Sequence, residues 1–360
     1  MTIQVAVIEG DDAAPEAMQP CVELLEQVNT TLGLGIEWVH PPVGKEAKEE
    51  YGSMFPDVAR EMIDSVDTTY FGSTSGSASQ ALFYLRWGKQ TFANVRPCRY
   101  LPGANSPLAD PQGIDFVIVR ENLEDMYVGV EGDLADLAGL NLISRTRRGS
   151  LTDLGEGRFA IKAITREGTE RVVRFSFELA RKRGAERGQE PHLTCTTKYN
   201  MLARSDGYFR DIAAELAADY ADVRFDTFII DDFACRMITQ PRAFDVVVMP
   251  NLYGDIMSDG AAGLIGGLGL AASGCYGHDY AYFESAHGTA PDIAGQNIIN
   301  PTATLLSGAM MLEYLGFVEA ARSVDEAIAA TYADGGCLTP DQNGSSTTTE
   351  FCEAIAARLR

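Results

Sequence analysis

The stretch Asn251-Leu-Tyr-Gly-Asp-Ile-Met-Ser-Asp259 carries two carboxylates four residues apart, Asp255 and Asp259. On a helix this spacing places both side chains on one face. The residues that follow, as far as Ser273, are mostly small or apolar and offer no charge to balance the pair. Mg²⁺ and Mn²⁺ take oxygen ligands and commonly use one or two carboxylates together with a substrate. Taken alone, such a pair is more often a preference of the helix dipole for acids near a helix start, so the metal-site interpretation depends on the rest of the chain.

The composition is that of a globular chain with an acidic surface. Its 360 residues are enough for two domains, and 46% of them are hydrophobic. With 29 basic and 51 acidic residues the formal net charge is −22, which repels phosphate backbones and anionic membranes. We therefore expect no nucleic-acid partner and no membrane partner. Such a surface fits a high-salt cytoplasm as well as ordinary solubility.

Cysteine usage and the N-terminus both indicate a cytoplasmic protein. The seven cysteines have no C-x-x-C spacing and are expected to be reduced. The first eight residues have the pattern of a strand and not of a signal peptide, and no apolar run reaches the length needed to span a membrane.

Strand-like and helix-like segments alternate along the chain, which predicts an α/β architecture with a mostly parallel sheet. The predicted strands are Ile3–Ile8, Asp115–Val119, Leu193–Thr196, Arg224–Ile230 and Ala243–Met249. Helical spacing of apolar residues covers 18–28 and 165–183, and the second helix ends in a basic group, 181–183, that we expect to be solvated. Residues 129–157 fit neither pattern and suggest a loop or a protruding arm. Gly267-Leu-Gly-Leu-Ala-Ala272 matches a dinucleotide fingerprint, but no β-branched strand precedes it, so we expect a turn.

Three arginines stand near or within conspicuous loops: Arg86, Arg96 and Arg120. Arg120 follows a buried-type strand, and open α/β sheets place their ligands at the carboxyl ends of strands. A guanidinium matches the geometry of a carboxylate. Each arginine alone is as readily explained by a surface ion pair, but together in an acidic protein they suggest a site for a di- or tricarboxylate.

Candidate proton-transfer groups and a third carboxylate lie in other segments. Tyr127 could deliver a proton if a nearby cation lowers its pKa, and Lys198 follows a strand, where it could act as a base. Either could equally be an ordinary surface or partly buried side chain. Asp231, at the end of a predicted strand, offers a third carboxylate to the metal. The long loop from Phe283 to Pro301 favours a binding role.

With these segments in view, the chain resembles the β-decarboxylating dehydrogenases, the family of isocitrate, 3-isopropylmalate, homoisocitrate and tartrate dehydrogenases. The resemblance rests most on the quoted 251–259 stretch and on His287-Gly-Thr-Ala-Pro-Asp-Ile-Ala-Gly295. It implies the two-domain fold of that family, with a mostly parallel sheet, and not a Rossmann fold. One domain would comprise 1–90 and 267–360, and the other 91–266 with an arm at about 129–163 and the dimer interface.

The resemblance also implies a role for each site residue. Arg86, Arg96 and Arg120 would bind the malate moiety of the substrate. Asp255 and Asp259, with Asp231 of a second subunit, would bind Mg²⁺ or Mn²⁺. Lys198, also from the second subunit and with Asn200 beside it, would remove the hydroxyl proton, and Tyr127 would protonate the product carbon. The active form would be a homodimer or a higher even oligomer.

The cofactor implied is NAD. The cofactor-binding residues would be His287, Gly288, Asp292, Ile293 and Asn300. An aspartate at position 292 resembles NAD-using members, because it would bind the ribose hydroxyls and repel a 2′-phosphate. The family usually has glycines where this chain has Asp12 and Ala14, which puts any close backbone approach to the cofactor there in doubt.

The substrate is expected to be a 3-substituted malate that loses CO₂ to give a 2-oxo acid. Leu82 and Phe83, with Met201, would form an apolar pocket like that for 3-isopropylmalate, whereas Arg120-Glu-Asn-Leu-Glu-Asp-Met-Tyr127 is closer to isocitrate enzymes. The substituent stays open. Two alternatives also stay open: a tartrate- or malate-type dehydrogenase, and a non-catalytic regulatory subunit of the same fold.

Overall fold

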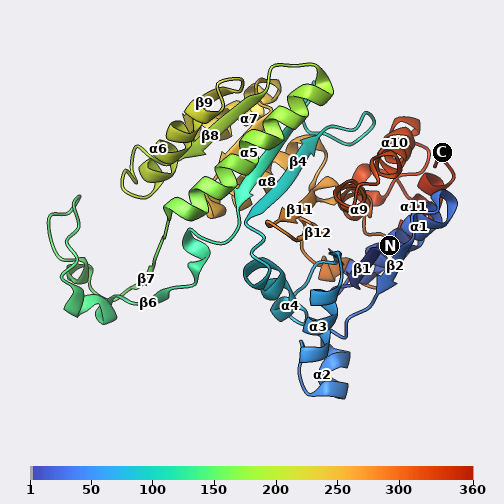
Figure 1. Ribbon diagram of the computed structural model, residues 1–360, viewed down its shortest axis with the longest axis horizontal. Coiled ribbons are helices and arrows are strands. Elements are labelled where there is room, and N and C mark those ends of the chain that lie inside the picture. The colour runs from blue at the N-terminus through green and yellow to red at the C-terminus, as the bar shows by residue number, and fades with distance from the viewer. Residues whose placement is uncertain (1–2, 360) are drawn as a thin grey trace.

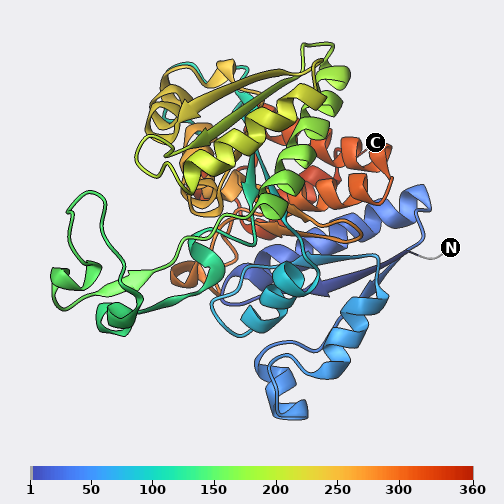
Figure 2. The same ribbon diagram turned by 60° about the vertical axis from the view of Figure 1, so that its left-hand side comes forward.

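In the computed structural model, which describes residues 3–359, one ten-stranded sheet runs through the molecule in the order β2-β1-β3-β12-β11-β4-β5-β10-β8-β9 (Figures 1 and 2). Its strands are β1 (Ile3–Ile8), β2 (Ile36–Val39), β3 (Thr68–Phe71), β4 (Ala93–Arg99), β5 (Asp115–Glu121), β8 (His192–Thr197), β9 (Arg224–Ile229), β10 (Val246–Met249), β11 (Ala272–Tyr276) and β12 (Ala281–Ser285). Neighbours are parallel except where β11 pairs with β12 and β4, and β4 with β5. The predicted α/β architecture with a mostly parallel sheet is confirmed.

Helices pack against both faces of this sheet. Among the described residues the α-helices are α1 (Ala14–Leu32), α2 (Lys45–Tyr51), α3 (Asp57–Ser65), α4 (Ser79–Phe83), α5 (Arg166–Arg187), α6 (Asp206–Leu216), α7 (Ile230–Thr239), α8 (Asn251–Ile265), α9 (Thr302–Tyr314), α10 (Val318–Asp334) and α11 (Thr348–Ala356). Helices α5 and α6 pack on β8, α7 packs on β8 and β9, and α8 packs on β4, β5 and β10 (Figure 1). Helix α9 packs on β11 and β12.

Several predicted segments have other bounds in the structure, among them the strand predicted at 243–249 and the helix predicted at 165–183. Strand β10 begins at Val246, because Pro241–Ala243 form a short 3₁₀ turn. The helix predicted to end at Arg183 continues to Arg187, where Gly188 ends it in a left-handed conformation. The expectation that its basic group is solvated is wrong for Arg183, whose Nε donates to Asp245 at 2.8 Å. The predicted turn at 267–272 is confirmed, since Gly267 has φ 115° and a 3₁₀ turn follows it.

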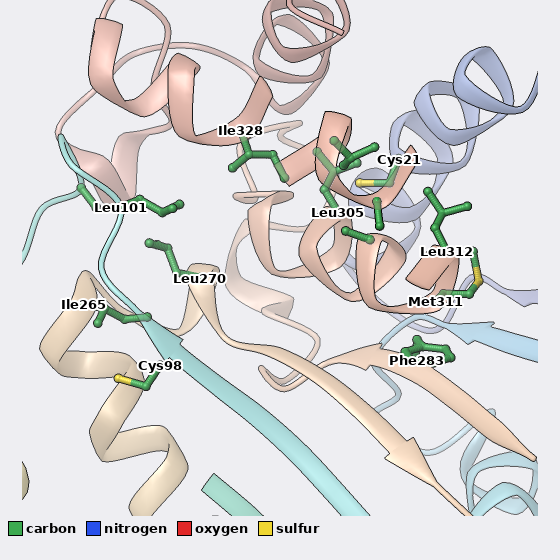
Figure 3. Packing of buried hydrophobic residues seen from close by; sticks show 14 of the residues in the cluster. Cys21, Cys98, Leu101, Ile265, Leu270, Phe283, Leu305, Met311, Leu312 and Ile328 are labelled. Atoms are coloured by element: carbon green, nitrogen blue, oxygen red, sulfur yellow. The ribbon is translucent and has the colours of Figure 1, made fainter. Parts of the chain in front are cut away.

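The hydrophobic core follows the sheet. Figure 3 shows a part of it where Leu305, Met311 and Leu312 of α9 lie above Phe283 of β12. Cys21 of α1 reaches the same cluster, which explains its burial as a small apolar side chain. No helix within residues 3–359 is both long and apolar enough to cross a membrane.

The predicted division of the chain into two domains corresponds to a single boundary between neighbouring strands of the sheet. Strands of the segments 1–90 and 267–360 make up the β2-to-β11 half, and strands of 91–266 make up the β4-to-β9 half. The two halves meet where Gly274 of β11 pairs with Val95 of β4. The domain boundaries themselves remain a prediction.

The segment 129–163 projects from the body, as Figures 1 and 2 show. Its two strands, β6 (Glu131–Asp133) and β7 (Arg158–Ala160), pair with each other and not with the main sheet. Beyond them the chain exposes large apolar side chains, including those of Leu140, Leu142, Ile143 and Leu154. An exposed apolar extension of this kind is suited to contact with another chain.

Helix α8 lies unusually close to β5 because of Gly254. A Cβ atom at this position would lie 2.5 Å from the Cβ of Arg120. Gly263, in the same helix, is exposed and has no such neighbour within 4 Å.

This contrast gives a prediction about stability. Gly254→Ala should lower the free energy of unfolding by about 1–3 kcal/mol, because the added methyl group forces α8 away from β5. Gly263→Ala should raise it by about 0.5–1 kcal/mol, because alanine favours the helix without meeting a neighbour. Urea unfolding of both variants checks this. Equal effects of the two substitutions would contradict the close-approach argument.

Candidate active site

The site forms where the carboxyl end of β5 meets the first two turns of α8. Arg120 lies near the end of β5, and Arg96 comes from its antiparallel neighbour β4. Helix α8 begins at Asn251, directly after β10, and presents Asp255 and Asp259 to the same edge. The predicted helical spacing of the two carboxylates is confirmed.

Arg120 is the most buried of the three arginines, with a side chain only 3% exposed. Its Nε donates to Asn251 Oδ1 at 2.7 Å, and its Nη1 contacts Asp255 Oδ1. The second oxygen of Asp255 accepts the Tyr127 hydroxyl at 2.8 Å. The guanidinium carbon lies 5.3 Å from the centre of the Tyr127 ring. The Asp255 carboxylate therefore links the buried guanidinium group of Arg120 to the hydroxyl of Tyr127, the candidate proton donor.

Arg96 lies near both carboxylates that the sequence suggests as metal ligands. Its Nη1 donates to Ser258 Oγ at 2.7 Å and lies 3.4 Å from Asp259 Oδ1 and 3.6 Å from Asp255 Oδ1. The two carboxylates thus share one buried guanidinium group while remaining partly exposed themselves.

Arg86 occupies a π-helical turn, Tyr84–Gly88, a rare conformation that is frequent at functional sites. Its Nε donates to the Tyr282 hydroxyl at 3.1 Å, and its Nη2 lies 3.3 Å from Glu284 Oε1. A buried acid of β12 thus orients this arginine.

The ionisable side chains of this cluster have pKa values that are shifted in different directions. Burial and the neighbouring Arg96 lower the pKa of Arg120 to about 10. Burial opposes ionisation of Asp255, but Arg120 and the bond from Tyr127 outweigh it, and the pKa of Asp255 is lowered. The pKa of Asp259 is raised, by burial and by repulsion from Asp255. Asp259 is therefore the carboxylate whose charge is least compensated.

Proton delivery by Tyr127 is predicted on the condition that an adjacent cation or metal lowers its pKa, and within this chain Arg120 alone does not meet that condition. Burial and the hydrogen bond to Asp255 raise the pKa of Tyr127, and Arg120 opposes them only in part. The phenol therefore keeps its proton at neutral pH, as a proton donor requires.

Lys198 and Asp231 pair with each other elsewhere. Lys198 Nζ lies 2.5 Å from Asp231 Oδ1, and this contact lowers the pKa of Asp231. Within residues 3–359 no three acid, histidine or cysteine side chains come together as a metal site, so Asp231 does not join Asp255 in one chain. Asn200 is exposed in the turn after Lys198. Completion of the site by a second subunit stays a prediction.

The loop that follows β12 is tied to the start of α1. Ala13 N donates to Thr289 O at 3.0 Å, and Thr289 Oγ1 donates to Asp12 Oδ2 at 2.6 Å. Asp12, with φ 54°, holds the left-handed conformation for which the family uses glycine, and its carboxylate is engaged with the loop. Glu16 also accepts backbone N–H groups of the loop.

The five predicted cofactor residues differ in their surroundings. Gly288 and Asp292 are exposed, and Ile293 packs against the start of α1. His287 Nδ1 bonds to the carbonyl of Gly288 at 2.8 Å, whereas its Nε2 is buried without a partner among the described residues. Burial lowers the pKa of His287, so the ring is neutral. The buried Asn300 is already bonded to Tyr332, Asp341 and Thr302, so it shapes this loop from beneath.

The predicted apolar pocket residues lie just before Arg86. Leu82 is half-buried on α4, and Phe83 is 54% exposed, with its ring 5.4 Å from that of Trp87. Met201 is 70% exposed after Lys198 and does not join them in an enclosed pocket.

Sequence reasoning missed four residues that orient the arginines: Asn251, Ser258, Tyr282 and Glu284. A signal was present for all of them. Asn251 and Ser258 share the helical face of Asp255 and Asp259, and Tyr282 and Glu284 are two apart on a strand and share its face.

The donor set fits a divalent cation. Asp255 and Asp259 project from one face of α8, remain 36% and 50% exposed, and are both oxygen donors. The adenosine side of a dinucleotide also finds matching groups in the unpartnered His287 Nε2 and in Asp292, whose carboxylate no hydrogen bond or ion pair engages within residues 3–359.

Comparisons relate this arrangement to known proteins. The family model described as Isocitrate/isopropylmalate dehydrogenase matches residues 4–355. A 3-isopropylmalate/3-methylmalate dehydrogenase of Methanocaldococcus jannaschii is 39% identical over 357 residues, which is 99% of each chain. An isocitrate/homoisocitrate dehydrogenase of Thermus thermophilus is 37% identical and covers 100% of this chain and 99% of its own. The crystal structure of isocitrate dehydrogenase from Methylococcus capsulatus has a TM-score of 0.85 and 34% identity, with 100% of both chains covered. The structural likeness confirms the predicted fold type.

Because the pKa values of Asp255 and Asp259 are shifted in opposite directions, replacing each with asparagine should have opposite effects on stability. The pKa of Asp255 is lowered by folding, so its stabilising effect is present above the usual aspartate range and is lost as pH falls through the lowered value. The pKa of Asp259 is raised, so its ionisation opposes folding at neutral pH and not at low pH. In metal-free protein, Asp255→Asn should cost about 1–3 kcal/mol of stability and Asp259→Asn should add up to about 1 kcal/mol.

Thermal unfolding at neutral pH and again below pH 3 measures both effects. The gain from Asp259→Asn should disappear in acid. A loss of stability from both variants at neutral pH would contradict the assignment.

Proposed function

Because the chain belongs to the isocitrate/isopropylmalate dehydrogenase family, we propose that it catalyses the NAD-dependent oxidative decarboxylation of a 3-substituted malate with Mg²⁺ or Mn²⁺. One observation carries the proposal: Arg96 and Arg120 share contacts with Asp255, and Tyr127 donates to the same carboxylate. Anion-binding groups, metal ligands and a protonated acid thus occupy one place.

The three arginines bind the substrate carboxylates. Arg120 is held by Asn251 and Arg86 by Glu284, so both guanidinium groups are oriented before substrate arrives. Such preorganised donors stabilise charge that develops during a reaction without reorganising at that moment. A bound Mg²⁺ or Mn²⁺, held by Asp255 and Asp259 with Asp231 of a second copy, would polarise the substrate oxygen.

Two side chains move the protons. Lys198 would take the proton of the substrate hydroxyl, and bound NAD would supply the acceptor for the hydride at the same carbon. The carboxylate at the neighbouring carbon then departs as CO₂ and leaves an enolate, which the arginines stabilise. Tyr127 protonates that carbon, and its raised pKa supports this role because the phenol holds a proton to give.

A homodimer follows from the position of Lys198. It pairs with Asp231 away from the arginine cluster, so in this proposal a second copy brings the pair to the site. Exposed apolar side chains support a contact through α7, α8 and the turn after β8: Ile238, Ile256, Met201 and Leu202.

The preference for NAD rests on Asp292. Its exposed, unengaged carboxylate suits the two hydroxyl groups of a ribose and repels a 2′-phosphate. Leu82 and Phe83 stand before Arg86 and would contact the substituent at carbon 3 of the malate.

The activity has a direct test. With Mn²⁺ and a panel of 3-substituted malates, the wild-type protein should reduce NAD, and Lys198→Ala should lower kcat by about 10²–10⁴-fold, because the base is lost. Mn²⁺ affinity should change little, since Asp255 and Asp259 remain. Lys182→Ala, which removes a surface lysine paired with Glu313, serves as the control with unchanged kcat. No NAD reduction with any malate would contradict the proposal.

Cofactor choice is tested separately. The wild-type kcat/KM should favour NAD over NADP by about tenfold or more, equivalent to about 1.4 kcal/mol. Asp292→Ser should narrow this ratio by removing the repulsive charge, chiefly through a lower KM for NADP. An equal or inverted ratio in the wild-type protein would overturn the preference.

A further inference from the structure

A lysine at the root of the arm lies between two fully buried carboxylates. Lys162 follows β7 by two residues, and its Nζ is 3.0 Å from Asp125 Oδ1 and 3.0 Å from Asp206 Oδ2. Both acids are 0% exposed and the lysine side chain is 12% exposed. The ring of Tyr253 covers the ammonium, with its centre 4.4 Å away.

One of the two acids fixes the start of helix α8. Asp125 Oδ2 accepts the backbone N–H of Leu252 at 2.8 Å, in the first turn of the helix that carries the metal-site carboxylates. Asp125 itself has φ 70°, a left-handed conformation that non-glycine residues rarely adopt. It is held there by paired backbone hydrogen bonds with Ala163, the residue next to Lys162.

The other acid fixes the position of Lys198. Asp206 Oδ1 accepts the backbone N–H of Lys198 at 3.0 Å, and the carbonyl of Asp206 accepts the Thr197 hydroxyl at 3.2 Å. Asp206 also receives the hydroxyl of Ser205. A single lysine therefore compensates two carboxylates that hold two separate parts of the catalytic machinery.

Charge explains why the lysine is needed. Two carboxylates without solvent must be paired, and removal of a buried partner leaves the remaining charge uncompensated. Without the ammonium, Asp125 and Asp206 would repel each other and draw water into the cluster, and their backbone contacts to α8 and to Lys198 would loosen together.

We propose that Lys162 is a positioning residue that holds the metal-binding helix and the Lys198 turn in one fixed relation. The inference rests on the proposed function, in which α8 serves the site of its own subunit and Lys198 serves the site of the other. Lys162 therefore acts on both active sites of the dimer, on one through metal binding and on the other through proton removal.

Mixed dimers separate the two effects. When one subunit carries Lys198→Ala, the only working site combines α8 of that subunit with Lys198 of the other. Lys162→Met, which keeps length without charge, is then placed in either subunit. In the subunit that supplies α8 it should weaken Mn²⁺ binding at the working site about tenfold. In the subunit that supplies Lys198 it should lower kcat about tenfold and leave the Mn²⁺ affinity of the working site unchanged, because the weakened metal site is then the one already inactivated by Lys198→Ala.

The matched control is Lys89→Met. Lys89 is 17% exposed, pairs with Asp64 at 2.6 Å, and lies 4.7 Å from the ring centre of Tyr280. Lys89 thus has the same kind of environment as Lys162, except that its acidic partner is half-exposed. Lys89→Met should therefore change neither Mn²⁺ affinity nor kcat. Lys162→Arg keeps the charge and is measured beside Lys162→Met. Its effects on Mn²⁺ affinity and on kcat should fall on the same two arrangements but be smaller, so the test remains possible if the methionine variant does not fold.

The result that overturns the proposal is an effect in only one of the two arrangements, or an equal loss of metal affinity and kcat in both. Failure of the proposed function gives a different result, namely parent dimers that reduce no NAD with any malate. In that case Mn²⁺ affinity of the Lys162 variants still decides: weaker binding than in the Lys89 control supports the role of Lys162 at α8, and unchanged binding overturns it.

Discussion

The buried guanidinium of Arg120 is the interaction on which the candidate site depends. A cation that is 3% exposed requires fixed partners, and it finds them in Asn251 and Asp255 of α8. Gly254, between them, lets the helix come close enough to β5 for both contacts. The arginine proposed to bind substrate and the carboxylate proposed to bind metal are thereby placed by one packing arrangement.

The candidate site is rich in positive charge, whereas the chain as a whole is acidic. The chain has a formal net charge of −22, yet three arginines meet at this edge of the sheet. An acidic surface around a cationic site would favour small polycarboxylates over large polyanions, in keeping with the proposed substrate. Asp259 keeps a charge that its neighbours compensate poorly. A group that costs stability in metal-free protein is expected where function requires it.

Much of the fold and of the candidate site could be predicted from the sequence, and there are physical reasons why the rest could not. The five predicted strands stand out as short apolar or β-branched runs, and Asp255 and Asp259 could be paired because four-residue spacing is local to one helix face. Strand β11, with the sequence Ala-Ser-Gly-Cys-Tyr, was not predicted, because its place in the sheet comes from its neighbours and not from β-propensity. Lys162 gave no signal, since its partners Asp125 and Asp206 lie 37 and 44 positions away (162 − 125 and 206 − 162) and only the fold brings them together. The raised pKa of Tyr127 likewise depends on burial that no motif records.

The central claim is that the active site is shared between two copies of the chain. Mixing Lys198→Ala subunits with Asp255→Asn subunits, each inactive alone, tests this most directly through NAD reduction with a 3-substituted malate. If the site is shared, half of the dimers in an equal mixture contain one intact site of two, and about a quarter of wild-type activity should return. A mixture that remains as inactive as the separate variants, while sedimentation shows that mixed dimers have formed, would contradict the account.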